Sequence, residues 1–468
     1  MRRVPAFALG CFASIPVWFF AALLTVLAGF ATAARAETLE QALVETYNTN
    51  PQILAERANL RAVDEGVDQA LAGWRPTLIF NGSAGKQQFE NTPQTQTELP
   101  QGVNEPRSMD FKLTQPLYQG GQTVAKTAQA EDSVQAERAH LIATEGSVLF
   151  STISAYLDVL RDQAVVDLDK SSEDLLTQTL NQTRAQFNVG ILTRTDVSQA
   201  EARLAAATAL RQQDEGTLAS DRANYARYVG HPPGTLEQPT LVPALPATRD
   251  EALGMAAIKN PNVISALFSE EASRDFVTAT EAQLLPSLNL VGEVNRTDDP
   301  TQLMGHETTF GMVSAQVTMP IYEGGLIYSQ SRQAKQQVAE SKNLTDDARR
   351  FAVQGATSAW ETIQAQRANV DSQTAAIAAD ATAYEGTKAQ QSVGVRTILD
   401  VLNAEQELFA DKVNLVKAQH DLVVAEFNLA QQMGRLTAVD LKLPVDVYDV
   451  QRYYKAVRGK WLGFGPNQ

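Results

Sequence analysis

Few residues of this 468-residue chain have the type and spacing that catalysis or metal binding requires. Four histidines are scattered along the sequence without a partner at metal-ligand spacing: His140, His231, His306 and His420. The two in expected helices, His140 and His420, are predicted to lie at the surface. The sequence has no Gly-x-Ser-x-Gly, phosphate-loop or dinucleotide motif, so it predicts neither an enzyme nor a cofactor or metal site.

Charge and composition exclude one further class of function. The chain has 54 acidic and 39 basic residues, a formal net charge of −15, and no basic patch segregated from this acidic excess. Because such a surface would repel phosphates, nucleic-acid binding is excluded as a function class. The 44% of hydrophobic residues is enough to fill a sizeable core.

The first 36 residues differ from the rest of the chain. Arg2 and Arg3 precede an uncharged apolar run, and Ala34-Arg35-Ala36 has the small-x-small pattern of a signal-peptidase site. We interpret 1–36 as a signal peptide; the alternative is a membrane anchor, because the run is long enough to span a bilayer. Cleavage would remove the only cysteine, Cys11, and change the formal net charge from −15 to −18. Beyond residue 36, no apolar stretch approaches the roughly 20 residues of a membrane helix.

One sequence unit occurs twice in the remaining chain. Early segments recur at an offset of 210 residues, and later segments recur at an offset of 204. The later pairs include Pro116-Leu117-Tyr118-Gln119-Gly120-Gly121 with Pro320-Ile321-Tyr322-Glu323-Gly324-Gly325, Val189-Gly190 with Val393-Gly394, and Asp196-Val197 with Asp400-Val401. The first copy, 37–230, and the second copy, 248–434, are joined by a proline-rich linker at 231–247, and 435–468 remains as a C-terminal tail.

Each copy predicts the same order of elements. A helix leads into a β-hairpin, at 77–117 in the first copy and at 287–319 in the second, where apolar and polar residues alternate. The intervening polar stretch of the first hairpin, Asn91 to Pro106, is predicted as a loop. After each Gly-Gly pair, roughly 70 residues without proline predict a helix on the order of 100 Å long, followed by a second long helix. Helices of this length must pack along one another, as coiled coils do.

Four half-apolar strands per chain pose a geometric problem. Each strand has one apolar and one polar face, as a membrane barrel wall has, but four strands cannot close and an open edge is unfavourable in lipid. Several chains that contribute strands to one barrel would solve this problem, and three chains would give twelve strands. The alternative is a soluble four-stranded sheet that packs on one face.

The repeated Pro-Leu/Ile-Tyr-x-Gly-Gly, the repeated Val-Gly turn followed by Asp-Val, and the proline-rich linker resemble the TolC family of outer-membrane efflux and secretion channels over essentially all of 37–434. The resemblance implies a mainly α fold with a membrane β part. Three chains would form a 12-stranded β-barrel in the bacterial outer membrane, continued by an α-helical tunnel in the periplasm.

The resemblance also implies partners. The homotrimer would be the exit duct of tripartite efflux and/or type I protein secretion systems, with a periplasmic adaptor and an inner-membrane ABC or proton-driven transporter. Two other classes remain open from the sequence. One is a periplasmic coiled-coil adaptor or structural protein without a pore, and the other is a periplasmic hydrolase.

By resemblance, the candidate site lies at the turns between the long helices. The family pattern implies that Asp400 belongs to a ring of carboxylates that constricts the tunnel entrance, and that Arg396 holds the closed state through Thr195 and Asp196. The residues alone favour a simpler role for these side chains in the first turns of helices, where the helix dipole favours an aspartate.

Two further positions depart from the family pattern at the same place. Asn403 stands where the compared family member has a second aspartate, and Gln391 stands where it has a tyrosine of the latch. The adaptor is implied to dock at the Val189-Gly190 and Val393-Gly394 turns.

Overall fold

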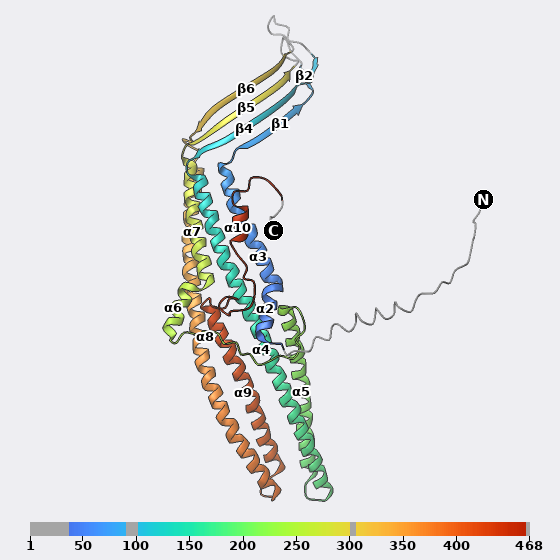
Figure 1. Cartoon of the computed structure of the whole chain (residues 1–468). Coiled ribbons are helices and arrows are strands. Elements are labelled where there is room, and N and C mark those ends of the chain that lie inside the picture. Colours follow the sequence, from blue (N-terminus) through green and yellow to red (C-terminus); the bar gives the residue numbers. More distant parts are fainter. Residues whose placement is uncertain (1–36, 90–101, 300–305, 465–468) are drawn as a thin grey trace, which may run out of the picture.

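The computed structural model describes residues 37–89, 102–299 and 306–464. The molecule is elongated, with a sheet at one end and long helices that run away from it (Figure 1). The predicted signal peptide, 1–36, and most of the predicted loop of the first hairpin lie outside the described residues. None of the described helices is both long and apolar enough to cross a membrane.

The two repeats contain matching helices and hairpins. The first comprises α2 (Leu39–Thr49), α3 (Pro51–Leu71), η1 (Ala72–Trp74), β1 (Thr77–Ala84), β2 (Gln87–Phe89), β3 (Gly102–Asn104), β4 (Arg107–Gln119), α4 (Gln122–Asn188) and α5 (Arg194–Val229). The second comprises α6 (Arg249–Lys259), α7 (Pro261–Glu281), η2 (Ala282–Leu284), β5 (Ser287–Asp299), β6 (His306–Thr318), α8 (Leu326–Ser392) and α9 (Ile398–Gln432). Helices α4 and α8 have 67 residues each, so the prediction of two helices about 100 Å long is confirmed.

The first hairpin differs in detail from the prediction. The first strand of the hairpin predicted at 77–117 is interrupted after Ala84, and β3 forms inside the stretch from Asn91 to Pro106 that is predicted as a loop. Strands β2 and β3 pair with each other as a separate two-stranded sheet, beyond the end of β1 and β4. Strand pairing in the first hairpin thus extends into the predicted loop.

The main sheet has four antiparallel strands in the order β1-β4-β5-β6. One row across it joins Phe80, Phe111 and Val294, which are half exposed, and the Phe80 and Phe111 ring centroids are 4.8 Å apart. The next row carries Asn81 and Asp110, and the Asn81 side chain donates a hydrogen bond to Asp110 Oδ2 at 3.2 Å. The predicted division into an apolar and a polar face is therefore present in the folded sheet.

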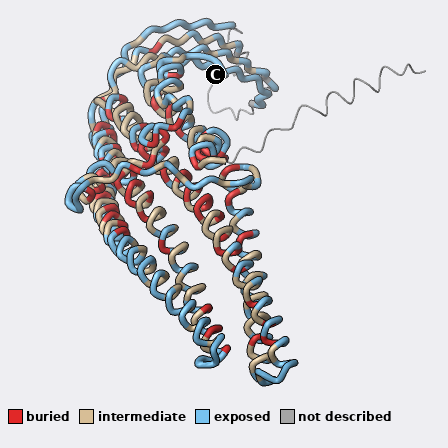
Figure 2. The backbone as a smooth tube through the Cα atoms, turned by 60° about the horizontal axis from the view of Figure 1, so that its bottom comes forward, coloured by how far each residue is buried: buried red, intermediate tan, exposed pale blue. Residues whose placement is uncertain are grey.

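The helices lie side by side, and the core gathers at the middle of the molecule. Helices α3, α4, α7 and α8 form a layer below the sheet, and the pairs α4–α5 and α8–α9 continue away from it (Figure 1). Buried residues concentrate where α2, α4, α5, the linker and the C-terminal tail meet, and the far halves of the helix pairs are mostly exposed (Figure 2). Tyr156 links this core to the linker, because its hydroxyl oxygen lies 2.8 and 2.6 Å from the carbonyl oxygens of Glu37 and Glu237, and its one proton can be donated to either.

The C-terminal tail packs on the helices. Leu436, Ala438, Leu441 and Leu443 join the main core, and the short helix α10 (Arg452–Val457) lies beside α3. The predicted C-terminal tail therefore packs against the helices up to α10.

Candidate functional site

Two short connections between long helices form the end of the molecule farthest from the sheet (Figure 1). One connects α4 to α5 and the other connects α8 to α9. Gly190 and Gly394 have φ values of +79° and +77°, which residues other than glycine rarely adopt. At each turn the glycine N–H and the next N–H return to carbonyls of the preceding helix, as in a Schellman motif. The two predicted Val-Gly turns therefore have the same backbone geometry.

The residues around both glycines are aliphatic and exposed. Val189, Ile191, Val393 and Val395 all project into solvent, each with about 70% or more of its surface accessible in the single chain. Exposed aliphatic side chains at a helix–helix turn form a small apolar surface, which is the kind of surface that a partner can cover.

Each turn leads into a helix with a capping box. Thr397 Oγ1 accepts a hydrogen bond from the Asp400 N–H at 3.3 Å, and Asp400 Oδ2 accepts from the Thr397 N–H at 2.9 Å. Thr193 and Asp196 repeat this arrangement at the start of α5. The hydrogen bond from the Thr397 backbone, then that from its hydroxyl, lower the pKa of Asp400, and the charge of Arg396 adds to this effect. Asp400 therefore stays ionised at neutral pH.

The other predicted site residues lie nearby, but one chain does not bring them all together. Arg396 is exposed and donates to Gln390 Oε1 at 3.3 Å, across its own turn. Gln391 contributes its carbonyl to the turn, and Thr195 is the second residue of α5. Asn403 Oδ1 accepts from Arg203 Nη2 at 2.8 Å, which ties α9 to α5.

Sequence reasoning missed Arg203 and a group of buried and half-buried carboxylates between α4 and α5, farther from the turns. Asp162 and Asp169 of α4 face Asp221 and Asp214 of α5. Burial, reinforced by the facing carboxyl group, raises the pKa of Asp169 to about 7 and that of Asp221 to about 6. A seven-residue spacing on both helices was the available signal, because residues seven apart share one face of an antiparallel helix pair.

The expectation of a surface role is wrong for His420. Its side chain on α9 is largely buried, and its ring nitrogens lie 3.0 Å from Asp158 of α4 and 2.9 Å from Asp421. Burial alone would lower the pKa of His420, but the hydrogen bonds to these two carboxylates outweigh it and raise the pKa. His140 is half exposed, as predicted. Among the described residues, no group of three or more histidine, cysteine, aspartate or glutamate side chains could hold a metal ion.

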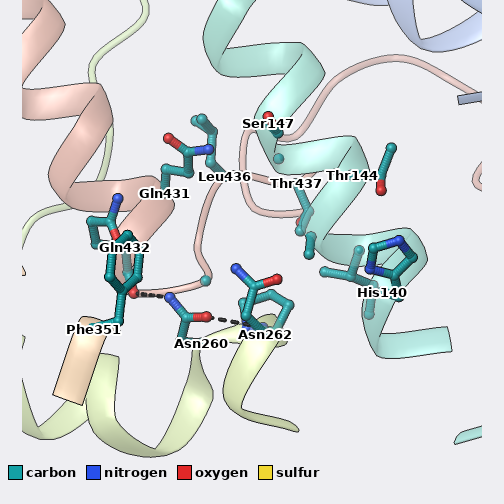
Figure 3. Close-up of a pocket in the computed structure, with 15 residues that line it drawn as sticks. His140, Thr144, Ser147, Asn260, Asn262, Phe351, Gln431, Gln432, Leu436 and Thr437 are labelled. Carbon is teal, nitrogen blue, oxygen red and sulfur yellow. Dashed lines mark hydrogen bonds between the residues drawn. The ribbon is translucent and has the colours of Figure 1, made fainter. Parts of the chain in front are cut away.

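A cavity of about 360 Å³ lies between the two repeats, where α4 approaches α7, α8 and the end of α9 (Figure 3). Asn260 caps α7 there, since its Oδ1 accepts from the Asn262 N–H at 2.9 Å, and its Nδ2 donates to the Gln432 carbonyl at 2.8 Å. In the first repeat, Asn50 makes the same two contacts, to the Gln52 N–H and the Tyr228 carbonyl. The asparagines thus join each short helix to the end of a long one, and their role is structural.

Known proteins share both the sequence and the fold. The model of the outer membrane efflux protein family matches residues 42–231 and 252–435. Outer membrane efflux protein BepC of Brucella suis is 33% identical over 441 residues, 94% of each chain. TolC of Escherichia coli is 24% identical over 89% of this chain and 86% of its own length. The alkaline protease secretion protein AprF of Pseudomonas aeruginosa is 25% identical, covering 91% and 90%.

Solved structures agree with these relatives. The crystal structure of the outer membrane protein VceC from Vibrio cholerae superposes with a TM-score of 0.73 at 20% identity, and covers 85% of this chain and 96% of that one. The repeated helices and hairpins of this chain are therefore a known architecture. The family model matches both repeats, and BepC is 33% identical over nearly the whole length. These two findings show that the chain belongs to the outer membrane efflux protein family.

Proposed function

We propose that three copies of this chain form one channel across the outer membrane, and that the channel is the exit duct of efflux and/or type I secretion systems. The main support for this proposal is that both edges of the sheet are unpaired within one chain. In the four-stranded sheet, β1 and β6 each pair on one side only, and β6 runs antiparallel to β1. Strand β6 of one chain could therefore pair with β1 of the next in the same antiparallel pattern. Twelve strands would close every edge and leave the apolar face toward lipid.

The relatives support both proposed transport roles. BepC is named an efflux protein and AprF a protease secretion protein. Because the sequence of this chain has no phosphate-loop motif, an inner-membrane ABC or proton-driven transporter would supply the energy. A periplasmic adaptor would connect the two, and the exposed Val189-Gly190 and Val393-Gly394 turns are its proposed docking points.

The proposed gate lies at the same turns. Three copies of Asp400 would place a ring of ionised carboxylates around the tunnel entrance, and three copies of Arg396 would lie beside them. A hydrogen-bonded arginine at an exposed site contributes about 0.2 to 1 kcal/mol, which a docking partner could overcome. With Asn403 in place of a second aspartate, cations would bind at one ring of charges.

Single-channel recording of the purified protein in planar bilayers tests the pore and its gate. Asp400→Asn removes the charge but keeps an oxygen that can accept the capping hydrogen bond, so we expect weaker block by divalent or trivalent cations from the periplasmic side. Arg396→Ser should raise the conductance. Asp371→Asn is the matched control, because Asp371 is an exposed aspartate of α8 that lies away from both turns.

Three outcomes would contradict the proposal. A protein that forms no pores would contradict the channel itself. Unchanged currents in both Asp400→Asn and Arg396→Ser would contradict the gate, and equal loss of cation block in Asp371→Asn would contradict the assignment of the constriction to Asp400.

A further inference from the structure

The end of the C-terminal tail has the opposite charge to the rest of the molecule, so the expectation that no basic patch is segregated is wrong for this short segment. Between residues 452 and 464 there are four basic side chains and no acidic one, although the whole chain carries −15. The same segment contains five aromatic and large aliphatic residues close together: Tyr453, Tyr454, Trp461, Leu462 and Phe464. The channel proposal does not use this segment.

Side-chain contacts of α10 and of the residue after it tie the segment to α3 and α4. The Tyr453 hydroxyl donates to Glu65 of α3 at 2.7 Å, while Arg458 pairs with Glu131 of α4 at 2.7 Å. Val457 is buried beneath them. Arg452 and Lys455 are exposed.

After α10, the chain turns, and hydrogen bonds hold it next to the residues that precede β1. Gly459, with φ +84°, makes the turn, and its N–H donates to Asp68 Oδ1 at 3.0 Å. Arg75 pairs with the same carboxylate at 2.5 Å and donates to the Lys460 carbonyl at 2.9 Å. Its guanidinium lies 5.5 Å from the centre of the Trp461 ring. Since Arg75 precedes the first residue of β1 by two positions, Trp461 is held at the level where the sheet begins.

The side chains that follow are displayed outward. Trp461 is 64% exposed, Leu462 is 91% exposed, and Phe464 is fully exposed. Other exposed aromatic residues lie at the ends of the strands that are nearest to the helices: Trp74, Tyr118 and Tyr322. Aromatic residues at such a level are typical of the membrane–water boundary of outer-membrane barrels. Trp461 and Phe464 of the tail thus add to the exposed aromatic residues at the strand ends.

We propose that residues 452–464 bind the phospholipid surface on the periplasmic side of the outer membrane. Trp461, Leu462 and Phe464 would insert at the boundary between headgroups and acyl chains, while Arg452 and Lys455 face anionic headgroups. Basic and aromatic residues together are the composition that binds an anionic membrane surface, and the attraction acts within about one Debye length. This inference rests on the proposed placement of the sheet in the membrane.

Spin labels test the inference in the full-length protein. Cys11→Ala removes the only cysteine of the sequence, so a nitroxide can be attached at Leu462→Cys, Val447→Cys or Val313→Cys, one at a time. Val313 lies on the apolar face of the sheet, and Val447 is an exposed tail residue before α10. In vesicles of phosphatidylethanolamine and phosphatidylglycerol, collision rates with oxygen and with a water-soluble nickel complex report the depth of each label.

We expect the oxygen-to-nickel collision ratio at Leu462 to lie several-fold above that at Val447 and below that at Val313. Arg452→Glu with Lys455→Glu should lower the ratio at Leu462. The matched pair Lys342→Glu with Lys412→Glu, on exposed helix positions away from the tail, should not. In phosphatidylcholine vesicles, the charge reversal at Arg452 and Lys455 should have little effect.

The outcomes separate this inference from the channel proposal. If the Val313 label lies in lipid but the Leu462 label is as water-accessible as Val447, the tail does not bind the membrane and the inference is overturned. A Leu462 label shielded from both reagents is covered by protein and also overturns it. If the Val313 label does not lie in lipid, the proposed membrane sheet fails, and the inference fails with it.

Discussion

Asp169 is the clearest pH-sensitive residue of the helix pairs. It is only 2% exposed and faces Asp214, and its pKa of about 7 lies far above the value of about 3.9 for a free aspartate. A carboxyl whose pKa is raised on folding contributes stability below the unfolded pKa, and this contribution is lost as the pH rises through about 7. The contact between α4 and α5 should therefore be more stable at pH 5 than at pH 8.

Asp169→Asn should remove much of this pH dependence, because an amide carries no charge at either pH. We expect the variant to gain on the order of 1 kcal/mol at pH 8, or about 1 to 3 °C in Tm, and little at pH 5. Thermal unfolding followed by circular dichroism measures this difference. Asp167→Asn is the control, because Asp167 is an exposed neighbour on the same helix. An unchanged pH dependence in Asp169→Asn would contradict the interpretation.

At the same scale, the sequence predicts roles better where they depend on local structure. The N-terminal-turn role of Asp196 and Asp400 follows from the residues themselves, and both form capping boxes. The burial of His420 and its contact with Asp158 depend on how α9 packs against α4, 262 positions away in sequence, which no local pattern encodes.

Among the elements, the two Val-Gly turns should respond to substitution in a characteristic way. An alanine Cβ at position 394 would meet no atom within 4 Å, so its cost would come from the left-handed backbone alone, about 1 to 2 kcal/mol. Gly386, inside α8, also has open space around it, but there alanine should stabilise the helix by about 1 kcal/mol.

Hydrogen exchange distinguishes the two substitutions. Gly394→Ala should accelerate amide exchange around residues 391–396, and Gly386→Ala should slow exchange in the last turns of α8. Slower exchange in both variants would show that the turn does not require a positive φ at position 394.

The elements themselves were largely predictable, with one class of exception. Long helices without proline and alternating strands have strong periodic signals, and α4, α8, β4 and β6 follow them. The short pair β2 and β3 spans three residues each, too few for a period to appear. The position of α10 was likewise not predictable, since contacts with Glu65 and Glu131 fix it rather than its own six residues.

For the whole molecule, the charge predicts ion selectivity. Removal of residues 1–36 would leave −18 per chain, and a trimer would carry −54. Part of this charge would line a water-filled tunnel, so cations should pass more readily than anions. The reversal potential across a bilayer with a KCl gradient measures the preference, and an anion-selective potential would contradict a tunnel lined by the acidic surface.

The central claim is that three chains close one barrel through β6 and β1. In a Cys11→Ala background, Asn81→Cys in β1 can be combined in turn with Phe310→Cys, Met312→Cys or Ser314→Cys in β6, all on the polar face of the sheet. Oxidation in the membrane, followed by electrophoresis under denaturing conditions, should give bands at two and three times the mass of the single chain on the same gel for at least one pair, and none above. Each cysteine alone should give no trimer. Failure of every pair to cross-link, a ladder that stops at dimers, or one that continues beyond trimers would contradict the account.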